Sequence, residues 1–90
     1  MKTLRYEKLT IYEVSSFAKE LTDYLSDAKD RLELDLSSVQ KIDIAVIQLL
    51  LSTSKSCTKR NIIFSIYGLN ETNKEILHLC GCDLLLGDEL

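Results

Sequence analysis

Metal or redox chemistry in this sequence would have to come from three cysteines and one histidine. Cys80 and Cys82 flank Gly81, and only His78 lies near them. Because a metal site needs three or four ligands at defined spacings, we interpret this segment as two cysteines around a glycine cap at the end of a helix. Three cysteines do not make a disulfide framework either. We therefore expect no metal site and no cofactor.

Catalytic motifs are also missing from the sequence. His78 is the single histidine, and no carboxylate stands at a triad-like spacing from it. The chain has no glycine-rich phosphate loop and no nucleophile elbow. A helical histidine without such partners belongs by default to the helix surface or to the edge of the core. These observations predict that the chain is not an enzyme.

A second group of polar side chains, from Ser37 to Asp43, could handle phosphate or contact a protein partner. Asp43 directly precedes an apolar run and is well placed to cap a helix there. A helix N-terminus has unpaired N–H groups and a positive dipole end, so it accommodates phosphate. Capping alone would account for Asp43, and partner contact or metal-assisted phosphate chemistry are the alternatives. We interpret Ser37 and Ser38 as turn residues that bond their own backbone, with a phosphorylation site as the alternative.

The elements that would hold this group follow from hydrophobic periodicity. Residues 1–10 alternate loosely between apolar and polar side chains, which predicts one or two short strands at a sheet edge. Thr10 and Glu13 have the spacing of a capping box. Apolar residues then recur at helical spacing, which predicts an amphipathic helix over residues 11–28. Residues 32–36 alternate with period two, which predicts a strand with one wet face.

The rest of the chain repeats this alternation of strand and helix. The elements predicted there are a helix from Ile44 to Lys59 ending at Asn61, a central strand over residues 62–67, a helix from Asn70 to Gly81, and a short strand or helical turn over residues 83–86. Strands that alternate with helices imply crossover connections. The sequence therefore predicts an α/β fold: one small layered domain over residues 1–90, with a mixed, largely parallel β-sheet and helices packed against it. Such sheets bind ligands or partners at the C-terminal ends of their strands, and the turn from Ser37 to Asp43 is one of these ends.

This order of elements and three motifs resemble the STAS family, typified by bacterial anti-sigma factor antagonists. The motifs are residues 9–12 before the first helix, the strand and turn from Asp35 to Asp43, and Leu79-Cys80-Gly81 at the end of the third helix. The resemblance covers almost the whole chain. It implies the STAS fold and a mechanism: the unphosphorylated antagonist binds an anti-sigma factor that is also a kinase. Phosphorylation of a hydroxyl near the helix start then ends the interaction.

In this resemblance the usual phosphoacceptor position falls on Ala45, the preceding hydroxyl position on Ile44 and the glycine on Val46. None of these residues can be phosphorylated. We expect no phosphosite at Ala45, and Ser37 or Ser38 would be the substitutes. Ile47 is expected in the core, while Ile44 could be buried or exposed. If the helix start is exposed, Ile44, Val46 and Ile47 would form an apolar patch. The expected partner-binding residues are Ser37, Ser38, Asp43, Ile44, Ala45 and Val46.

Charge and hydropathy exclude several classes of partner. The net charge is −3 and no basic cluster exceeds Lys59-Arg60, which argues against nucleic acid because phosphate contacts need concentrated positive charge. No window approaches the roughly 18 apolar residues of a membrane span, and the N-terminus lacks the apolar region of a signal peptide. We expect a cytoplasmic chain without direct membrane insertion, and a solvated acidic pair at Asp88-Glu89.

Three functions remain open. The first is a non-enzymatic protein-interaction domain that resembles an anti-sigma factor antagonist in bacterial signalling and transcription regulation. Its partner would be anti-sigma factor kinase-like, and binding would be constitutive or controlled elsewhere. The alternative is a small structural subunit of a larger cytoplasmic assembly, such as a lipid ABC transporter. A third is a binding module for a small apolar or nucleotide ligand, with its pocket beside Asp43. A homodimer is compatible with all three.

Overall fold

The computed structural model of the protein describes residues 1–87, and the acidic pair Asp88-Glu89, expected to be solvated, lies outside these residues. Strands and helices alternate along the chain as the sequence predicts. The elements are β1 (Lys2–Thr3), β2 (Lys8–Leu9), α1 (Val14–Asp27), β3 (Arg31–Asp35), β4 (Lys41–Ile42), α2 (Ile44–Lys59), β5 (Ile63–Tyr67), α3 (Glu71–Leu79) and the short 3-10 helix η1 (Asp83–Leu85).

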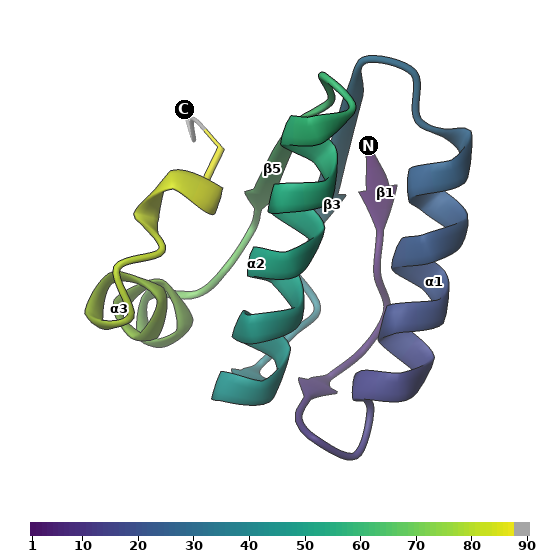
Figure 1. Ribbon diagram of the computed structural model, residues 1–90. Helices are drawn as coiled ribbons and strands as arrows, with labels where there is room; N and C mark the ends of the chain where they lie inside the picture. Colours follow the sequence, from purple (N-terminus) through teal and green to yellow (C-terminus); the bar gives the residue numbers. More distant parts are fainter. Residues whose placement is uncertain (88–90) are drawn as a thin grey trace.

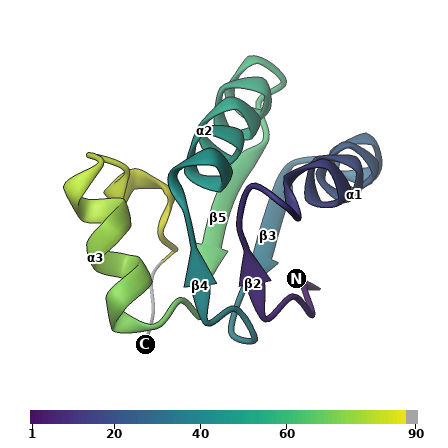
Figure 2. The ribbon, with the colours of Figure 1, turned by 90° about the horizontal axis from the view of Figure 1, so that it is seen from below.

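The sheet confirms the predicted α/β class. Strands β1, β3 and β5 form one sheet in that order, β2 and β4 form a separate pair, and all of these pairings are parallel. Helices α1 and α2 lie side by side on one face of the three-stranded sheet, and α3 lies beyond β5 (Figures 1 and 2). Among residues 1–87 no helix has the length and apolar character needed to cross a bilayer.

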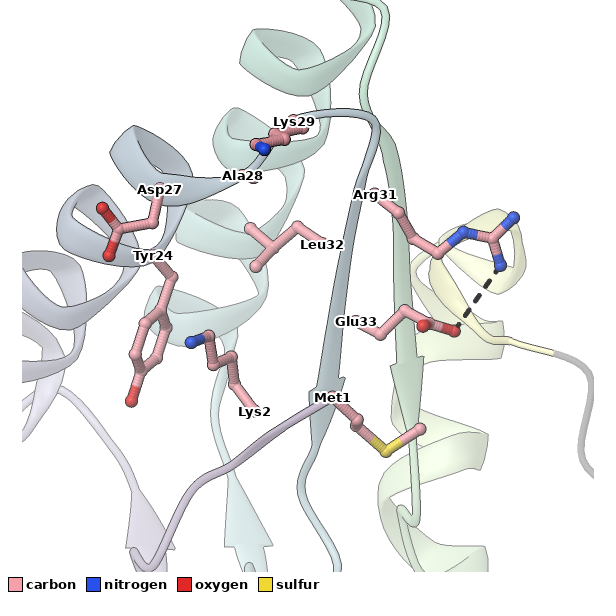
Figure 3. A pocket seen from close by; sticks show the side chains of 9 residues that line it. All are labelled: Met1, Lys2, Tyr24, Asp27, Ala28, Lys29, Arg31, Leu32 and Glu33. Atoms are coloured by element: carbon pink, nitrogen blue, oxygen red, sulfur yellow. Dashed lines mark ion pairs between the residues drawn. The ribbon is translucent and has the colours of Figure 1, made fainter.

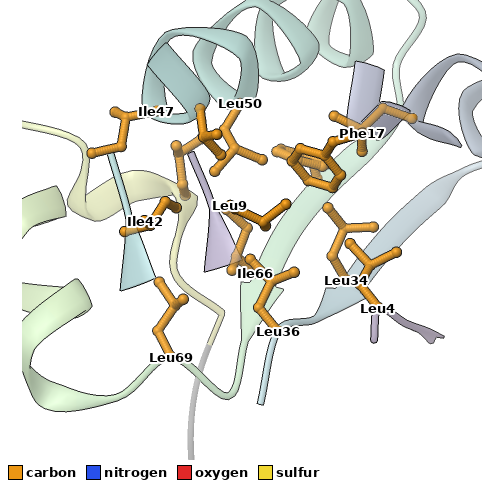
Figure 4. Close-up of a cluster of buried hydrophobic side chains, with 14 of the residues drawn as sticks. Leu4, Leu9, Phe17, Leu34, Leu36, Ile42, Ile47, Leu50, Ile66 and Leu69 are labelled. Carbon is orange, nitrogen blue, oxygen red and sulfur yellow. The ribbon is translucent and has the colours of Figure 1, made fainter. Parts of the chain in front are cut away.

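The core lies between this sheet and the two helices. The alternation over residues 32–36 places Leu32, Leu34 and Leu36 in the interior, while Glu33 and Asp35 remain partly exposed on the opposite face. This confirms the predicted strand with one wet face. Figure 4 shows Leu34 and Leu36 packed beneath Phe17 of α1 and Leu50 of α2. The fully or almost fully buried apolar residues of these two helices are Phe17, Leu21, Val46, Ile47, Leu50 and Cys57.

The first helix begins later than predicted. Its first residue is Val14 instead of residue 11, because Thr10 to Glu13 form a separate turn in which the Glu13 N–H donates to the Thr10 carbonyl at 3.0 Å. The Glu13 carboxylate accepts from the Thr10 N–H at 2.9 Å, as a capping box requires. The reciprocal bond is replaced, since the Thr10 hydroxyl accepts from the Tyr12 N–H at 3.3 Å.

The later boundaries agree with the sequence prediction. Asn61 has a left-handed backbone with φ of 58° after α2. The Asn70 side chain caps α3 by accepting from the Asn73 N–H at 2.8 Å. Gly81, with φ of 72°, follows the end of α3. Residues 83–86 were predicted as a short strand or a helical turn. They form the helical turn η1, which is followed by a parallel bridge between Leu86 and Ile66.

Candidate functional site

The start of α2 is fixed by the small sheet of β2 and β4. Leu9 and Ile42 lie opposite each other in this pair, and both side chains are buried. The pairing continues into the helix start, since the Asp43 N–H donates to the Leu9 carbonyl at 3.1 Å. The end of β2 and the start of α2 therefore lie together at one edge of the molecule.

Asp43 joins the two segments through both carboxylate oxygens. Its Oδ1 accepts from the Val46 N–H at 3.2 Å, which confirms the predicted helix cap. Its Oδ2 accepts from the Ile11 N–H at 2.8 Å, in the turn between β2 and α1. The carboxylate is thus engaged within the chain on both sides, which supports the capping interpretation over metal-assisted phosphate chemistry.

The turn from Thr10 to Glu13 is held by its own side chains as well. The Thr10 hydroxyl donates to the Glu13 carboxylate at 2.7 Å, in addition to the bond from the Thr10 N–H. These two hydrogen bonds, the hydroxyl first, lower the pKa of Glu13 below its ordinary value because they stabilise the charged form. A charged Glu13 keeps the turn closed and fixes the positions of Ile11 and Tyr12.

Three large apolar side chains are exposed at this edge. The exposed fractions are 63% for Ile11, 90% for Tyr12 and 62% for Ile44. Ile11 is bonded through its N–H to Asp43, the residue directly before Ile44, so the three residues lie together around this carboxylate. We call Ile11, Tyr12 and Ile44 the apolar corner.

Residues 7–87 match a protein-family model described as "Mlab, STAS domain". The chain belongs to the STAS family. This confirms the resemblance seen in the sequence, and the matched region includes the whole apolar corner. No curated protein matches the chain. STAS domains generally bind other proteins, so the exposed surface at the start of α2 is the candidate site of this domain.

The structure distributes the predicted partner-binding residues over different environments. Ser37 and Ser38 are exposed in the turn after β3, where the Ser37 N–H donates to the Asp35 carboxylate at 3.0 Å. Ile44 is exposed and Ala45 is half-buried. Val46 is fully buried, so its side chain offers no surface to a partner and it leaves the candidate site.

The apolar patch of Ile44, Val46 and Ile47, expected if the helix start were exposed, does not form, whereas the prediction that Ile47 lies in the core is confirmed. Val46 lies roughly 200° around the helix from Ile44, and both Val46 and Ile47 face the core. An apolar surface does exist, but Ile44 shares it with Ile11 and Tyr12. Ile11 and Tyr12 were not predicted as site residues because a helix starting at residue 11 would place Ile11 on the same buried face as Val14. The signal for the later start was the paired Thr10 and Glu13.

Cysteine and histidine side chains do not assemble a metal site. Cys57 and Cys82 are buried and Cys80 is exposed, and among residues 1–87 no three potential ligands cluster. Burial raises the pKa of both buried thiols, which keeps them protonated. His78 does have a carboxylate partner that the spacing did not reveal: its Nδ1 lies 2.9 Å from Asp83 Oδ2. Both side chains of this pair are exposed.

A hollow of about 210 Å³ lies at the other end of the sheet (Figure 3). Its lining residues come from the start of β1, the end of α1 and the first half of β3: Met1, Lys2, Tyr24, Asp27, Ala28, Lys29, Arg31, Leu32 and Glu33. Arg31 points away from Lys2 and pairs with Glu33 at 3.9 Å, so the cations do not converge on one point. The hollow is smaller than usual ligand pockets and is not beside Asp43, where the third hypothesis expected one.

Proposed function

We propose that this STAS domain is a non-enzymatic docking module that binds a protein partner through the apolar corner. The observation that carries the proposal is the exposure of Ile11, Tyr12 and Ile44 around one hydrogen-bonded carboxylate. Large exposed apolar patches on soluble proteins mark interaction sites. Aromatic side chains that become buried dominate the binding energy of interfaces, so Tyr12 would be the main anchor.

The corner is held rigid before any partner binds. Asp43 ties the turn to α2, and Glu13 closes the turn from within. A surface that is already ordered loses less conformational entropy on binding. Ser37, Ser38 and Ala45, together with Asp43, complete the proposed surface around the apolar centre. We also propose that the domain acts in the cytoplasm and that nucleic acid is not its partner.

Ala45 determines whether the proposed interaction can be controlled by phosphorylation at the start of α2. The family resemblance places the phosphoacceptor at this position, and alanine has no hydroxyl. A phosphate at the helix start would add a charge of about −1.5 to −2 and expel an apolar partner. Because Ala45 cannot carry one, binding is constitutive or controlled elsewhere, with the exposed Ser37 and Ser38 as substitute phosphosites.

The cellular role that we propose is bacterial signalling of the anti-sigma factor antagonist kind, with an anti-sigma factor kinase-like partner. The second candidate is a structural subunit of a larger cytoplasmic assembly, such as a lipid ABC transporter. The apolar corner favours this second role, since permanent interfaces are larger and more apolar than transient ones. Disruption by Ala45→Glu would be expected in both cases, and both partners could bind ATP, but only the first role predicts a partner that has protein kinase activity.

The docking surface is tested by site-specific photo-crosslinking in the native host. A benzophenone side chain at position 12 should capture one protein reproducibly, and the same group at position 84, in η1, should not capture that protein. The captured protein is then purified, and its affinity is measured for Tyr12→Ala, Ile44→Ser and the control Asp23→Ala on the exposed side of α1. Tyr12→Ala should weaken binding by at least roughly 10-fold. Capture of the partner protein at position 84 but not at position 12, or equal affinity for all variants, would contradict the corner as the docking surface.

Regulation is tested separately with two measurements. Ala45→Glu should weaken partner binding without lowering stability, because a carboxylate in the first turn of a helix interacts favourably with the helix dipole. Intact mass measured after incubation with the partner and ATP should be unchanged. A phosphate on Ser37 or Ser38 would overturn the constitutive reading and leave the docking surface intact.

A further inference from the structure

A second exposed apolar surface lies on the side of α2 that faces η1. Leu84, in η1, has the largest exposed fraction of the large apolar residues within residues 1–87, at 95%. It borders an open hollow of about 570 Å³. The other residues lining this hollow are Ser54, Thr58, Asn61, Ile62, Ile63 and Phe64. The exposed Leu84 side chain therefore lies beside a hollow that is large enough to receive an apolar side chain.

The edge of the sheet is open at the same place. β5 pairs with β3 along its whole length, but on its outer side the backbone pairing found within residues 1–87 is limited to the segment after η1. The contacts there are the bridge between Ile66 and Leu86 and the Gly87 N–H that donates to the Ile66 carbonyl at 2.8 Å. Within residues 1–87 the first half of β5 therefore has no neighbouring strand on that side, and the exposed Ile63 lies there.

The polar residues that line the hollow are Ser54, Thr58 and Asn61. The Thr58 hydroxyl donates to the Ser54 carbonyl at 3.0 Å within α2, so its hydrogen bond is already made. The apolar part of the lining comes from Leu84 and from Ile62, Ile63 and Phe64, of which Ile63 is exposed. An apolar side chain entering the hollow would not leave this hydroxyl unsatisfied.

Charge is distributed unevenly around this surface. α2 contains Lys55 and Lys59, is followed by Arg60, and has no carboxylate, although the net charge of the whole chain is −3. Lys59 and Arg60 lie between Thr58 and Asn61, which both line the hollow. Asp83, directly before Leu84, has an exposed carboxylate, one oxygen of which lies 2.9 Å from His78 Nδ1 in the same chain. The positive charges of Lys59 and Arg60 thus lie next in sequence to residues of the hollow, and the negative charge of Asp83 lies next in sequence to Leu84.

We propose that a second copy of this chain covers this surface, with Leu84 of each copy seated in the hollow of the other. In a two-fold symmetric pair each surface meets itself turned by 180°. Leu84 of one copy then faces the hollow of the other, and Asp83 of one copy faces Lys59 and Arg60 of the other. Both the shape and the charge of this one surface are therefore complementary to a second copy.

The pair would be of modest strength, because the contact is confined to η1, the first half of β5 and the end of α2. Interfaces of small area are typical of weak, transient contacts, so we expect a dissociation constant between roughly 10 µM and 1 mM. The pairing does not involve the apolar corner and does not depend on the docking function. A variant at the corner therefore serves as its matched control.

The test is sedimentation equilibrium of the full chain from about 10 µM to about 2 mM, a range that spans the expected dissociation constant. The wild-type chain should change from monomer to dimer across it. Leu84→Arg should weaken the dimer by at least roughly 30-fold, while Ile44→Ser should leave it unchanged. Arg60→Glu should weaken the dimer, and adding Asp83→Lys should restore it by re-forming the pair with reversed charges. In a mixture of isotopically labelled and unlabelled chains, contacts should appear between Leu84 methyl groups and Ile62 or Ile63 of the other copy.

Two results would overturn the proposal. One is a chain that remains monomeric throughout the concentration range. The other is a dimer that Leu84→Arg does not weaken. Because Leu84 is almost fully exposed, its replacement should leave the fold intact, and an unchanged circular dichroism spectrum and urea midpoint verify this.

Discussion

Removal of the Asp43 carboxylate should loosen both segments that form the apolar corner. Asp43→Ala deletes the cap on the Val46 N–H and the bond to the Ile11 N–H. Loss of an N-cap costs about 1 kcal/mol. A charge-assisted hydrogen bond adds about 1.5–3 kcal/mol, but water can replace the carboxylate at the exposed Ile11, so we take about 1 kcal/mol for it. The expected loss of unfolding free energy is about 2 kcal/mol, a large share of the 5–15 kcal/mol typical of such domains.

Urea unfolding measures this loss, and amide exchange locates it. With an m-value of about 1 kcal/mol per molar for a chain of this size, the midpoint should fall by about 2 M urea. Asp43→Asn keeps one acceptor oxygen and should lose about half as much. Exchange of the Ile11 and Val46 amides should accelerate in Asp43→Ala. The matched control is Asp23→Ala on the exposed side of α1, which should stay within about 0.5 kcal/mol.

Asp43 does not hold the two segments together if Asp43→Ala destabilises the chain no more than Asp23→Ala. The same conclusion follows if the Ile11 amide exchanges at the wild-type rate while the Val46 amide is accelerated. The second result would mean that the carboxylate caps α2 without holding the turn. The apolar corner would then lack the rigidity on which its proposed role depends.

Two further predictions concern stability. Burial, followed by the hydrogen bond to Glu20, raises the pKa of Tyr6 from 10.0 to about 12. The folded chain therefore keeps a proton that the unfolded chain releases, and stability should fall as pH rises from about 10 to about 12; Tyr6→Phe should flatten this fall in urea midpoints measured across the range. Gly68→Ala should destabilise more than Gly81→Ala in the same assay. Both glycines have positive φ, but only at Gly68 would the added carbon meet other atoms, with Asp35 Oδ1 at 2.7 Å; equal losses would contradict this.

Local patterns in the sequence were sufficient to predict much of the fold. The period-two leucines around Leu34 set the buried face of β3, because alternate residues of a strand face opposite sides. The caps at Asp43 and Asn70 were predictable because each acts on an N–H three residues away. Short-range chemistry of this kind does not depend on the rest of the fold.

Contacts between distant residues account for what the sequence did not reveal. The pairing of β2 with β4 joins strands of two residues each, too short for any periodicity to show. The Asp43 bond to the Ile11 N–H spans 32 residues. Without it, the turn between β2 and α1 could not be placed beside Ile44. The apolar corner is therefore a product of tertiary structure, which is why only one of its three residues was identified beforehand.

The two proposed surfaces lie at opposite ends of α2, and this separation has a consequence for binding. Ile44 and Thr58 are separated by about 21 Å along the helix at 1.5 Å per residue. A partner at the apolar corner would therefore leave the hollow beside Leu84 free for a second copy. The resulting pair would present two corners at once. A partner with two matching sites would then bind the pair more tightly than a single copy, with no new contact at either corner. In this arrangement, weak pairing through Leu84 would control the strength of docking, even though Ala45 cannot carry the phosphate that would otherwise regulate it.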